Sequence, residues 1–237
     1  MSPAPDLAEF YDDAYSHTGA EAEKWARWRA LSARGKADHV VALRPASPQV
    51  VCEVGCGDGA LLAELAGRGY GREHVGFEVS PEAARIAGGR AELRVAAFDG
   101  EHIPEADGAF DLGLLSHVLE HVPDPAVLLR ETARVCREVV VEVPLEDNLS
   151  ARRPGKVAEA QRIGHLQRFS RADIHALAAD CGLRVAGELS DALPLAVHRF
   201  HGSGGFSKWA VRAGLLRLAP PLARRLFTVH YAALLVR

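Results

Sequence analysis

Three glycines at alternate positions, directly after a short apolar run, constrain this chain more than any other feature. Residues 50–54 read VVCEV, which is rich in β-branched residues and typical of a strand buried on both faces. The loop GCGDG follows at residues 55–59, and Leu61, Leu62 and Leu65 then recur at helical spacing. Because glycine has no Cβ, the backbone of such a loop can lie directly against a ligand. We therefore predict a strand, a tight loop and a helix, with a ligand at the loop.

The spacing of these glycines argues against a dinucleotide ligand. A dinucleotide fingerprint reads G-x-G-x-x-G and presents a helix N-terminus to a pyrophosphate. Here Gly59 comes one residue early, and Asp58 places a negative charge where a pyrophosphate would be repelled. A second apolar run ends in Glu78, and an acidic residue at that strand tip can accept hydrogen bonds from both ribose hydroxyls. A nucleoside ligand without phosphates is favoured, and a nicotinamide dehydrogenase is disfavoured.

Four motifs in order resemble those of the class I S-adenosylmethionine-dependent methyltransferases. They are EVGCGDG at 53–59, VGFEVS at 75–80, AFDGEHIP at 97–104 and FDLGLLSHVLEHV at 110–122. The resemblance is tight over residues 50–143 and looser over 164–183 and the last strand. Within the family it points to the small-molecule, ubiquinone- and menaquinone-biosynthesis-like group.

This resemblance implies an α/β fold. We expect a Rossmann-like, doubly wound sheet of seven strands in the order 3-2-1-4-5-7-6, with the seventh strand antiparallel. Residues 1–46 are expected to form an N-terminal helical cap, and residues 47–237 the methyltransferase domain. Within that domain we expect a lid loop over 145–168 and a C-terminal insertion on the substrate side over 190–226.

The resemblance also implies S-adenosylmethionine as cofactor, with S-adenosylhomocysteine as product. Glu78 is expected to hold the ribose, Asp99 to meet the adenine amino group and Phe98 to lie against the ring; the alternative for Asp99 is a simple turn residue. The expected cofactor-binding residues are Tyr11, Glu53, Gly55, Cys56, Gly57, Asp58, Gly59, Glu78, Val79, Phe98, Asp99, Gly100, Ser116 and His117. The expected substrate-binding residues are Tyr15, Trp25, Trp28, His165 and Trp209. For the N-terminal aromatic residues, ordinary packing is an equal alternative, and Trp209 could instead face a second subunit or a membrane.

Methyl transfer from a sulfonium is an in-line displacement, so the protein mainly has to align the acceptor and exclude water. A hydroxyl or acidic carbon needs a base that titrates near neutrality. The histidines nearest the reaction centre are His117 and His165, followed by His121, and a wall residue is the alternative for each. Ser116 and His117 replace the N-P-P-Y signature of many nitrogen methyltransferases. We expect transfer to an oxygen of a small metabolite, with nitrogen or carbon less favoured.

Residues 117–121 read HVLEH, the H-x-x-E-H spelling of a zinc-peptidase helix. That motif needs a long helix, but VPDP follows at 122–125 and would end one. No other cluster has metal-ligand spacing, so we predict no metal.

Further elements follow from turn and cap signals. Ser80 should cap a helix that begins at Pro81. Asp124 should cap a helix over 125–137 whose Val127, Leu128 and Val135 face inward, and Ser170 with Asp173 should form a capping box. The remaining strands are expected at 92–97, 109–116, 139–143, 183–189 and 227–236.

Composition leaves the partner open. The 237 residues carry a net charge of −3, yet residues 148–237 hold 14 Lys and Arg against 5 Asp and Glu. Solvated helix faces are the first interpretation of this basic part, and an anionic acceptor or a nucleic acid the second. No stretch interleaves basic and aromatic residues, which argues against RNA binding. The alternatives are a methyltransferase that acts on RNA or protein through the basic C-terminal part, and a non-catalytic cofactor-binding module. We expect a cytoplasmic monomer or homodimer with reduced cysteines, no signal peptide and no transmembrane segment.

Overall fold

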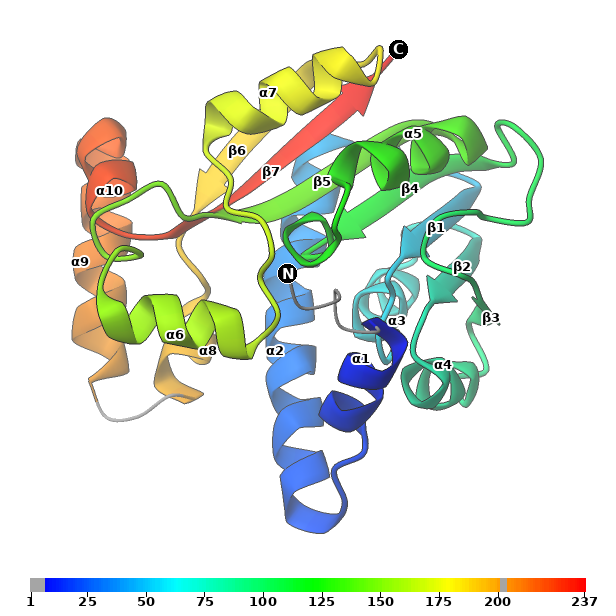
Figure 1. Ribbon diagram of the computed structural model, residues 1–237, viewed down its shortest axis with the longest axis horizontal. Helices are drawn as coiled ribbons and strands as arrows, with labels where there is room; N and C mark the ends of the chain where they lie inside the picture. Colours follow the sequence, from blue (N-terminus) through cyan, green and yellow to red (C-terminus); the bar gives the residue numbers. More distant parts are fainter. Residues whose placement is uncertain (1–6, 201–203) are drawn as a thin grey trace, which may run out of the picture.

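The central sheet of the protein has the expected strand order. The computed structural model describes residues 7–200 and 204–237 (Figure 1). The strands are β1 (Val50–Val54), β2 (Glu73–Glu78), β3 (Arg94–Ala97), β4 (Phe110–Ser116), β5 (Cys136–Leu145), β6 (Arg184–Asp191) and β7 (Val229–Val236). They form one sheet in the order β3-β2-β1-β4-β5-β7-β6, in which β7 is antiparallel to both neighbours. The predicted Rossmann-like fold is confirmed.

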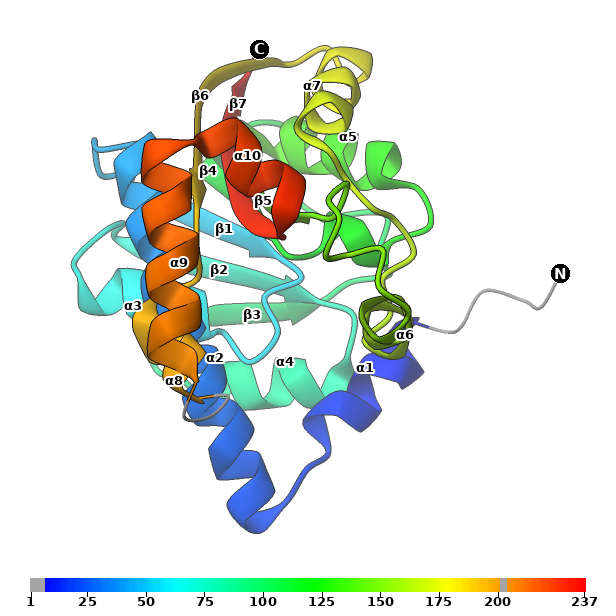
Figure 2. The same ribbon diagram turned by 90° about the vertical axis from the view of Figure 1, so that its left-hand side faces the viewer.

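Helices cover both faces of this sheet. They are α1 (Leu7–Tyr15), α2 (Gly19–Leu43), α3 (Ala60–Gly67), α4 (Pro81–Gly88), α5 (Pro125–Val135), α6 (Pro154–Arg162), α7 (Arg171–Asp180), α8 (Leu195–Phe200), α9 (Gly205–Leu218) and α10 (Pro220–Leu226), with a short 3-10 helix, η1 (Leu119–His121). Figure 2 shows α2, α3, α8 and α9 on one side, and α5 and α7 on the other. An apolar core lies on each face of the sheet. Alternate residues of β1 pack into the two cores, because Cys52 and Val54 belong to one and Val51 to the other. The strands are therefore buried on both faces, as their unbroken apolar runs predict.

The predicted helix caps are present. Ser80 Oγ accepts from the backbone N of Ala83 (3.1 Å), and Asp124 Oδ1 accepts from the backbone N of Ala126 (2.9 Å). Ser170 and Asp173 bond each other's backbone N–H groups as a capping box. Because each cap fixes the turn between a strand or loop and its helix, the chain enters these helices at defined angles.

Several predicted boundaries are wrong. The helix expected over 125–137 ends at Val135, because Cys136 already pairs with Phe110 of β4 as the first residue of β5. Val127 is 39% exposed and does not face inward, since the buried face of α5 runs through Leu128, Leu129 and their neighbours. β5 starts three residues earlier and ends two later than expected, and the other strand ends shift by one or two residues, at the starts of β3, β4 and β7 and at both ends of β6.

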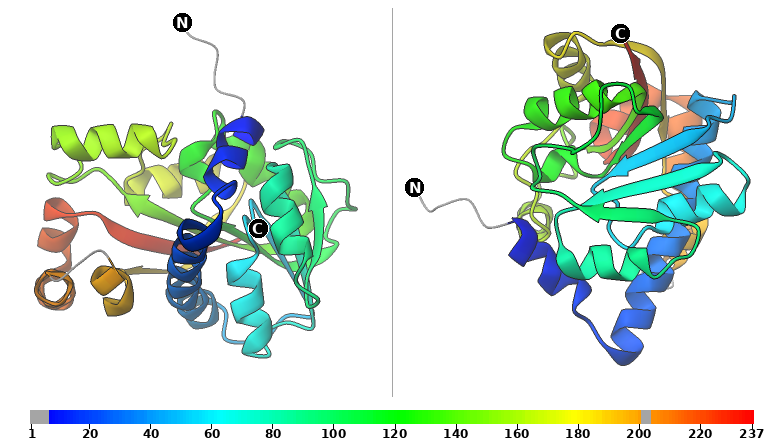
Figure 3. Two further views of the ribbon diagram at one scale, coloured as in Figure 1. Left: turned by 90° about the horizontal axis from the view of Figure 1, so that it is seen from below. Right: turned by 90° about the vertical axis from the view of Figure 1, so that its right-hand side faces the viewer.

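The N-terminal segment folds as two helices, and residues 1–6 of the expected cap lie outside the described residues. The second of them, α2, is one continuous helix of 25 residues. Helix α1 packs against α4, as Figure 3 shows. Asp12 of α1 accepts from Ser80 Oγ (2.5 Å) and from the backbone N of Glu82 (3.0 Å). A carboxylate at a helix N-terminus is favourable, so Asp12 anchors α1 to the start of α4.

Two segments interrupt the C-terminal half of the fold. The segment 145–168 carries α6, and the insertion 190–226 carries α8, α9 and α10, apart from residues 201–203, which are not described. Within the described ranges no helix has the length and apolar character needed to cross a membrane.

Candidate active site

A cleft opens at the carboxyl ends of β1, β2 and β4, beneath α1. Its volume is about 130 Å³. The residues that line it are Tyr11, Tyr15, Gly55, Gly57, Glu78, Val79, Phe98, Gly100, His117, Val118, His121, Val122 and Leu128. In a doubly wound sheet this is the edge where ligands bind. Nine of the residues expected at the cofactor or substrate therefore share one cleft, although they come from separate stretches of sequence.

The glycine loop forms the floor of this cleft. Gly55 and Gly57 both have positive φ, at 72° and 54°. A Cβ on Gly55 would lie 2.7 Å from Val118 Cγ2, and a Cβ on Gly57 would collide with the Tyr15 hydroxyl. Both the backbone conformation and the available space thus require glycine at these positions.

Glu78 lies at the tip of β2 and is held by three backbone N–H groups. Its carboxylate accepts from Gly57 (2.7 Å), Val79 (2.8 Å) and Ser80 (2.9 Å). Burial raises the pKa of Glu78, and the three backbone hydrogen bonds act in the opposite direction. The carboxylate is therefore fixed in place at the wall of the cleft, next to the glycine loop.

Other predicted cofactor residues lie behind the cleft rather than in its lining. Asp58 binds the guanidinium of Arg29 (2.7 Å), and that guanidinium lies 4.8 Å from the centre of the Tyr15 ring. Cys56, Gly59, Ser116 and Glu53 are all buried. Burial raises the pKa of Glu53 to about 8, so its side chain is mostly neutral at pH 7. Glu53 Oε2, Ser116 Oγ and the Tyr11 hydroxyl have no hydrogen-bond partner among the described residues.

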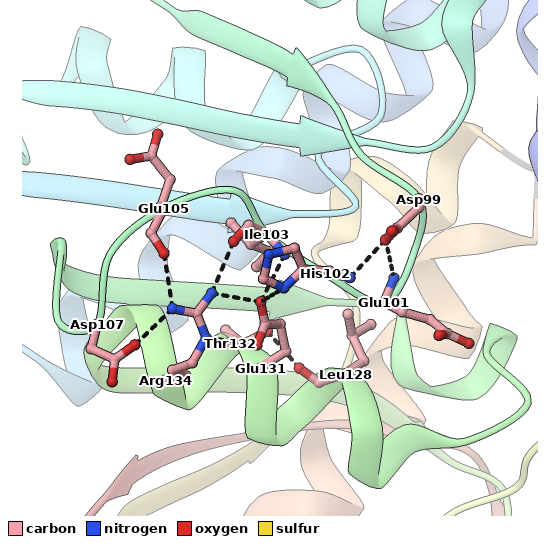
Figure 4. A network of polar contacts seen from close by, with 10 residues as sticks. All are labelled: Asp99, Glu101, His102, Ile103, Glu105, Asp107, Leu128, Glu131, Thr132 and Arg134. Carbon is pink, nitrogen blue, oxygen red and sulfur yellow. Dashed lines mark hydrogen bonds and ion pairs between the residues drawn. The ribbon is translucent and has the colours of Figure 1, made fainter.

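The loop after β3 is shaped by polar contacts. Phe98 and Gly100 line the cleft, whereas Asp99 does not. Asp99 Oδ1 accepts from the backbone N of Glu101 (2.8 Å) and His102 (2.6 Å), which lowers the pKa of its carboxyl (Figure 4). The turn role of Asp99 is thus visible in the structure, and its contact with adenine stays a prediction.

A network drawn in Figure 4 ties the same loop to α5. Arg134 donates to Asp107 (2.7 Å), to Glu131 and to the backbone O of Ile103 (2.9 Å), and Glu131 accepts from the backbone N of Ile103 (2.7 Å). Hydrogen bonding by Arg134 lowers the pKa of Glu131 to about 2. The Arg134 guanidinium and the Glu131 carboxylate are both charged at neutral pH. Their contacts therefore hold the loop that carries Phe98 toward the cleft against α5.

His117 follows β4 in a conformation unusual for its residue type. Its φ is 58°, and no other non-glycine residue within 7–200 and 204–237 has a positive φ. The ring lies between Glu120, whose Oε1 is 3.0 Å from Nδ1, and His230, whose Nδ1 is 3.0 Å from Nε2. Burial lowers the pKa of His117, but hydrogen bonds with Glu120 and Glu142 outweigh it and raise the pKa overall.

His121 and His165 stack edge to face, with ring centres 4.8 Å apart. His121 lines the cleft, its Nδ1 lies 3.2 Å from the backbone O of Gly164, and burial lowers its pKa. His165 is not part of the cleft lining, and its Nδ1 lies 3.0 Å from Glu146 Oε2. Among the three histidines expected near the reaction centre, His121 is therefore the neutral one that faces the cleft.

Comparison with known proteins places the chain in a family. A family model for the methyltransferase domain matches residues 22–187, well over half of the chain. The chain belongs to the class I S-adenosylmethionine-dependent methyltransferases. The resemblance that its motifs suggested is confirmed.

Sequence relatives match this methyltransferase over a limited stretch. It is 37% identical over 95 residues to ajmaline N-methyltransferase of Rauvolfia serpentina, which is 37% of this chain and 32% of that protein. It is 32% identical over 102 residues to a ubiquinone biosynthesis O-methyltransferase of Xanthomonas axonopodis, which is 40% of this chain and 41% of that protein. The chain thus spans only about a third of the length of the first of these relatives, and the ubiquinone-like subgroup has weak support.

Solved structures match over nearly the whole methyltransferase. A geranyl diphosphate methyltransferase in complex with SAM has a TM-score of 0.65, 17% identity and coverage of 94% of this chain and 92% of that chain. A methyltransferase from Haloferax volcanii, solved with the activator Trm112, has a TM-score of 0.67, 18% identity and coverage of 95% and 98%. At these identities the likeness shows the fold.

The predicted tryptophans do not reach the cleft of the methyltransferase. Trp25 and Trp28 pack edge to face on α2, with ring centres 6.2 Å apart, and neither lines the cleft. Trp209 lies on α9 beside Phe206, and α9 stands at the β6 end of the sheet, away from α1 and α4 (Figure 1). The insertion instead lines a cavity of about 420 Å³ with Leu216, Pro220 and Arg224, and this cavity shares no lining residue with the cleft.

Two groups of side chains that could hold a metal ion adjoin the cleft, although sequence spacing showed none. One is His117, Glu142 and His230, and the other is Glu120, His121 and His165. Sequence spacing does not report the first group, because it brings together the residue after β4 with residues of β5 and β7. The available signal was a polar residue inside an apolar strand, at Glu142 in VVVEVP and at His230 in TVHYAALL.

Proposed function

We propose that this chain transfers a methyl group from S-adenosylmethionine to an oxygen of a small metabolite. The observation that carries the proposal is the Glu78 carboxylate, fixed by three backbone N–H groups beside a glycine loop that contains Asp58 and no pyrophosphate fingerprint. This wall suits a ribose with free hydroxyls. Transfer to nitrogen or carbon is the less favoured variant, because the chain lacks the N-P-P-Y motif at residues 116–119.

The residues of the cleft fit the cofactor. Glu78 would accept from the ribose hydroxyls, Phe98 would lie against the adenine, and the backbone at Gly55 and Gly57 would approach the methionine part. Three buried polar atoms, on Glu53, Ser116 and Tyr11, have no partner in the described protein and are available to a polar ligand. Buried polar atoms are normally paired, so the unpaired hydroxyl of Tyr11, which lines the cleft, supports a ligand site. The residues proposed to surround the cofactor are Cys56, Asp58, Gly59, Val79, Asp99, Gly100 and His117.

S-adenosylmethionine supplies a methyl group on a positively charged sulfur, which leaves readily. The task left to the protein is to exclude water, orient the acceptor and take its proton. His121 suits the last role best, because it lines the cleft and its lowered pKa keeps it neutral. We expected His117 and His165 to rank first. Both ring nitrogens of His117 are engaged, Nδ1 by Glu120 and Nε2 by His230. His165 lies outside the cleft lining and packs against the ring of His121.

We further propose that segment 145–168 acts as the lid. Its residues pack next to the cleft: Leu166 and Gln167 donate to the backbone O of Glu120 (2.8 and 3.0 Å). Gly164 lies against the Phe10 ring of α1, where a Cβ would be only 2.9 Å from Cε1. Tyr15 would then shape the acceptor side of the cleft. The insertion 190–226 lines a separate cavity, so its place on the substrate side stays a prediction.

Calorimetry tests the cofactor first. Titration of the full chain with S-adenosylhomocysteine should give saturable binding, and NAD⁺ under the same conditions should give none. Tight NAD⁺ binding, or no binding of the adenosyl ligand, would overturn the proposal.

A second experiment identifies the acceptor. The chain is incubated with metabolite extract and isotope-labelled cofactor, and products that gain one labelled methyl group are sought by mass spectrometry. Binding without any methylated product across extracts would instead support a non-catalytic module. His121→Gln should retain cofactor binding and lose turnover, and His165→Gln should lose less.

A further inference from the structure

Three polar side chains meet at the tips of β4, β5 and β7. His117 Nε2 lies 3.0 Å from His230 Nδ1 and 3.5 Å from Glu142 Oε1, and His230 Nδ1 lies 3.4 Å from the same oxygen. The three atoms form a nearly equilateral triangle. Glu142 is 2% exposed, and the two rings are mostly buried.

This triangle has the size of one face of a tetrahedral zinc site. Zinc binds imidazole nitrogen and carboxylate oxygen at about 2.0–2.1 Å, so tetrahedral ligand atoms lie about 3.3 Å apart. The three measured separations average close to that value. We propose that His117, Glu142 and His230 bind a divalent transition metal ion, with zinc the preferred occupant. Three protein ligands, rather than four, are the pattern of a zinc that keeps one position for water or substrate.

The surroundings orient each ligand as metal sites require. His117 Nδ1 lies 3.0 Å from Glu120 Oε1, which leaves Nε2 for the metal. Glu142 Oε2 lies 3.0 Å from His39 Nδ1, which leaves Oε1 for the metal. Metal-bound histidines and carboxylates usually have such hydrogen-bonded supports. The left-handed backbone at His117 swings its ring toward His230, and strained backbone of this kind clusters at functional sites.

The charge balance also favours a cation. Glu120 and Glu142 are buried carboxylates, and Glu120 Oε2 has no partner among the described residues. Lys36 of α2 faces both ligand histidines, and His39 is offset by Asp191, whose Oδ2 lies 3.6 Å from His39 Nε2. When both ligand histidines are neutral, the two carboxylates exceed Lys36 by one negative charge.

The neighbouring group of Glu120, His121 and His165 fits a metal less well. Glu120 Oε1 lies 4.0 Å from His121 Nε2, which is longer than a tetrahedral edge. The group therefore serves as a comparison for the experiment.

Cobalt is a suitable probe, because Co²⁺ in a tetrahedral site absorbs visible light strongly and Zn²⁺ replaces it. The full chain is first stripped with a chelator and then titrated with CoCl₂. We expect one equivalent of bound Co²⁺ with a tetrahedral spectrum, and loss of that spectrum on adding one equivalent of Zn²⁺. No such spectrum in the unmodified chain would overturn the proposal. The measurement needs no methyl transfer, so it is independent of the proposed function.

Variants assign the ligands. His230→Gln and Glu142→Gln should weaken Co²⁺ binding by at least about tenfold. His165→Gln is the matched control and should leave it unchanged. Loss of Co²⁺ binding in His165→Gln, with normal binding in His230→Gln and Glu142→Gln, would place the metal in the neighbouring group and overturn the proposal. Circular dichroism and S-adenosylhomocysteine binding check that each variant folds. Should a ligand variant unfold, His39→Gln keeps all three ligands and should weaken binding about 10–100-fold by releasing Glu142.

Discussion

The two halves of the sheet build their parts of the site differently. Around β1, β2 and β3 the cleft is made of backbone: positive-φ glycines, N–H groups and one carboxylate that they hold. Around β5 and β7 it adjoins side chains from distant parts of the chain, since Glu142, His230 and His39 meet only after folding. The backbone part of the site comes from residues that are contiguous in sequence, so short motifs predict it. The side-chain part depends on the register of the strands.

The largest effect should come from breaking the backbone half. Gly57→Val would have to adopt a positive φ and displace the Tyr15 hydroxyl. We expect S-adenosylhomocysteine affinity to fall by at least about 3 kcal/mol, measured by calorimetry. Gly67→Ala is the control, because a Cβ there meets nothing within 4 Å. Unchanged binding by Gly57→Val would mean that the loop is not the binding surface.

A pH experiment tests the buried carboxyl at the end of β1. Burial raises the pKa of Glu53 from 4.5 to about 8, so the folded state holds a proton that the unfolded state releases. The stability tied to that proton is complete below pH 4.5 and is lost as the pH rises through 8. Glu53→Gln should therefore gain about 3–4 kcal/mol in unfolding free energy over the unmodified chain between pH 5 and 9, measured by urea denaturation. A constant difference would show that Glu53 is ionised in the fold.

Glu78→Gln sharpens the role of the strand-tip carboxylate. It keeps the shape of the side chain but removes the charge that would bind two ribose hydroxyls. We expect S-adenosylhomocysteine affinity to fall by about 1–3 kcal/mol. Glu82→Gln, four residues on in α4, is the control and should bind normally. Equal loss in both variants would point to a general charge effect.

The smallest effect is expected in the other half of the sheet. Ser170→Ala removes one side of the capping box that starts α7 and should lower the unfolding free energy by about 1 kcal/mol. Cofactor affinity should not change, because α7 lies outside the cleft lining. A matching loss of affinity would show that the two halves are coupled.

The same contrast explains what could be predicted from sequence. Gly55, Gly57 and Glu78 were found because strand, turn and helix signals follow one another within a few residues. The helix caps at Ser80, Asp124 and Ser170 were found for the same reason. The group of His117, Glu142 and His230 spans more than a hundred residues, and no spacing rule reports it. Trp209 was expected near the substrate by family position, but α9 carries it to the far end of the sheet.

Helix α1 has a consequence for the speed of the enzyme. It is anchored by Asp12, and its Tyr15 hydroxyl lies against Gly57 of the glycine loop. The cleft beneath it has a volume of about 130 Å³, whereas small-molecule pockets usually measure about 300–1,000 Å³. We expect α1 to move away from the glycine loop before S-adenosylhomocysteine leaves and S-adenosylmethionine enters. In the proposed reaction the rate of this opening, rather than that of the chemical step, would then set the upper limit on turnover.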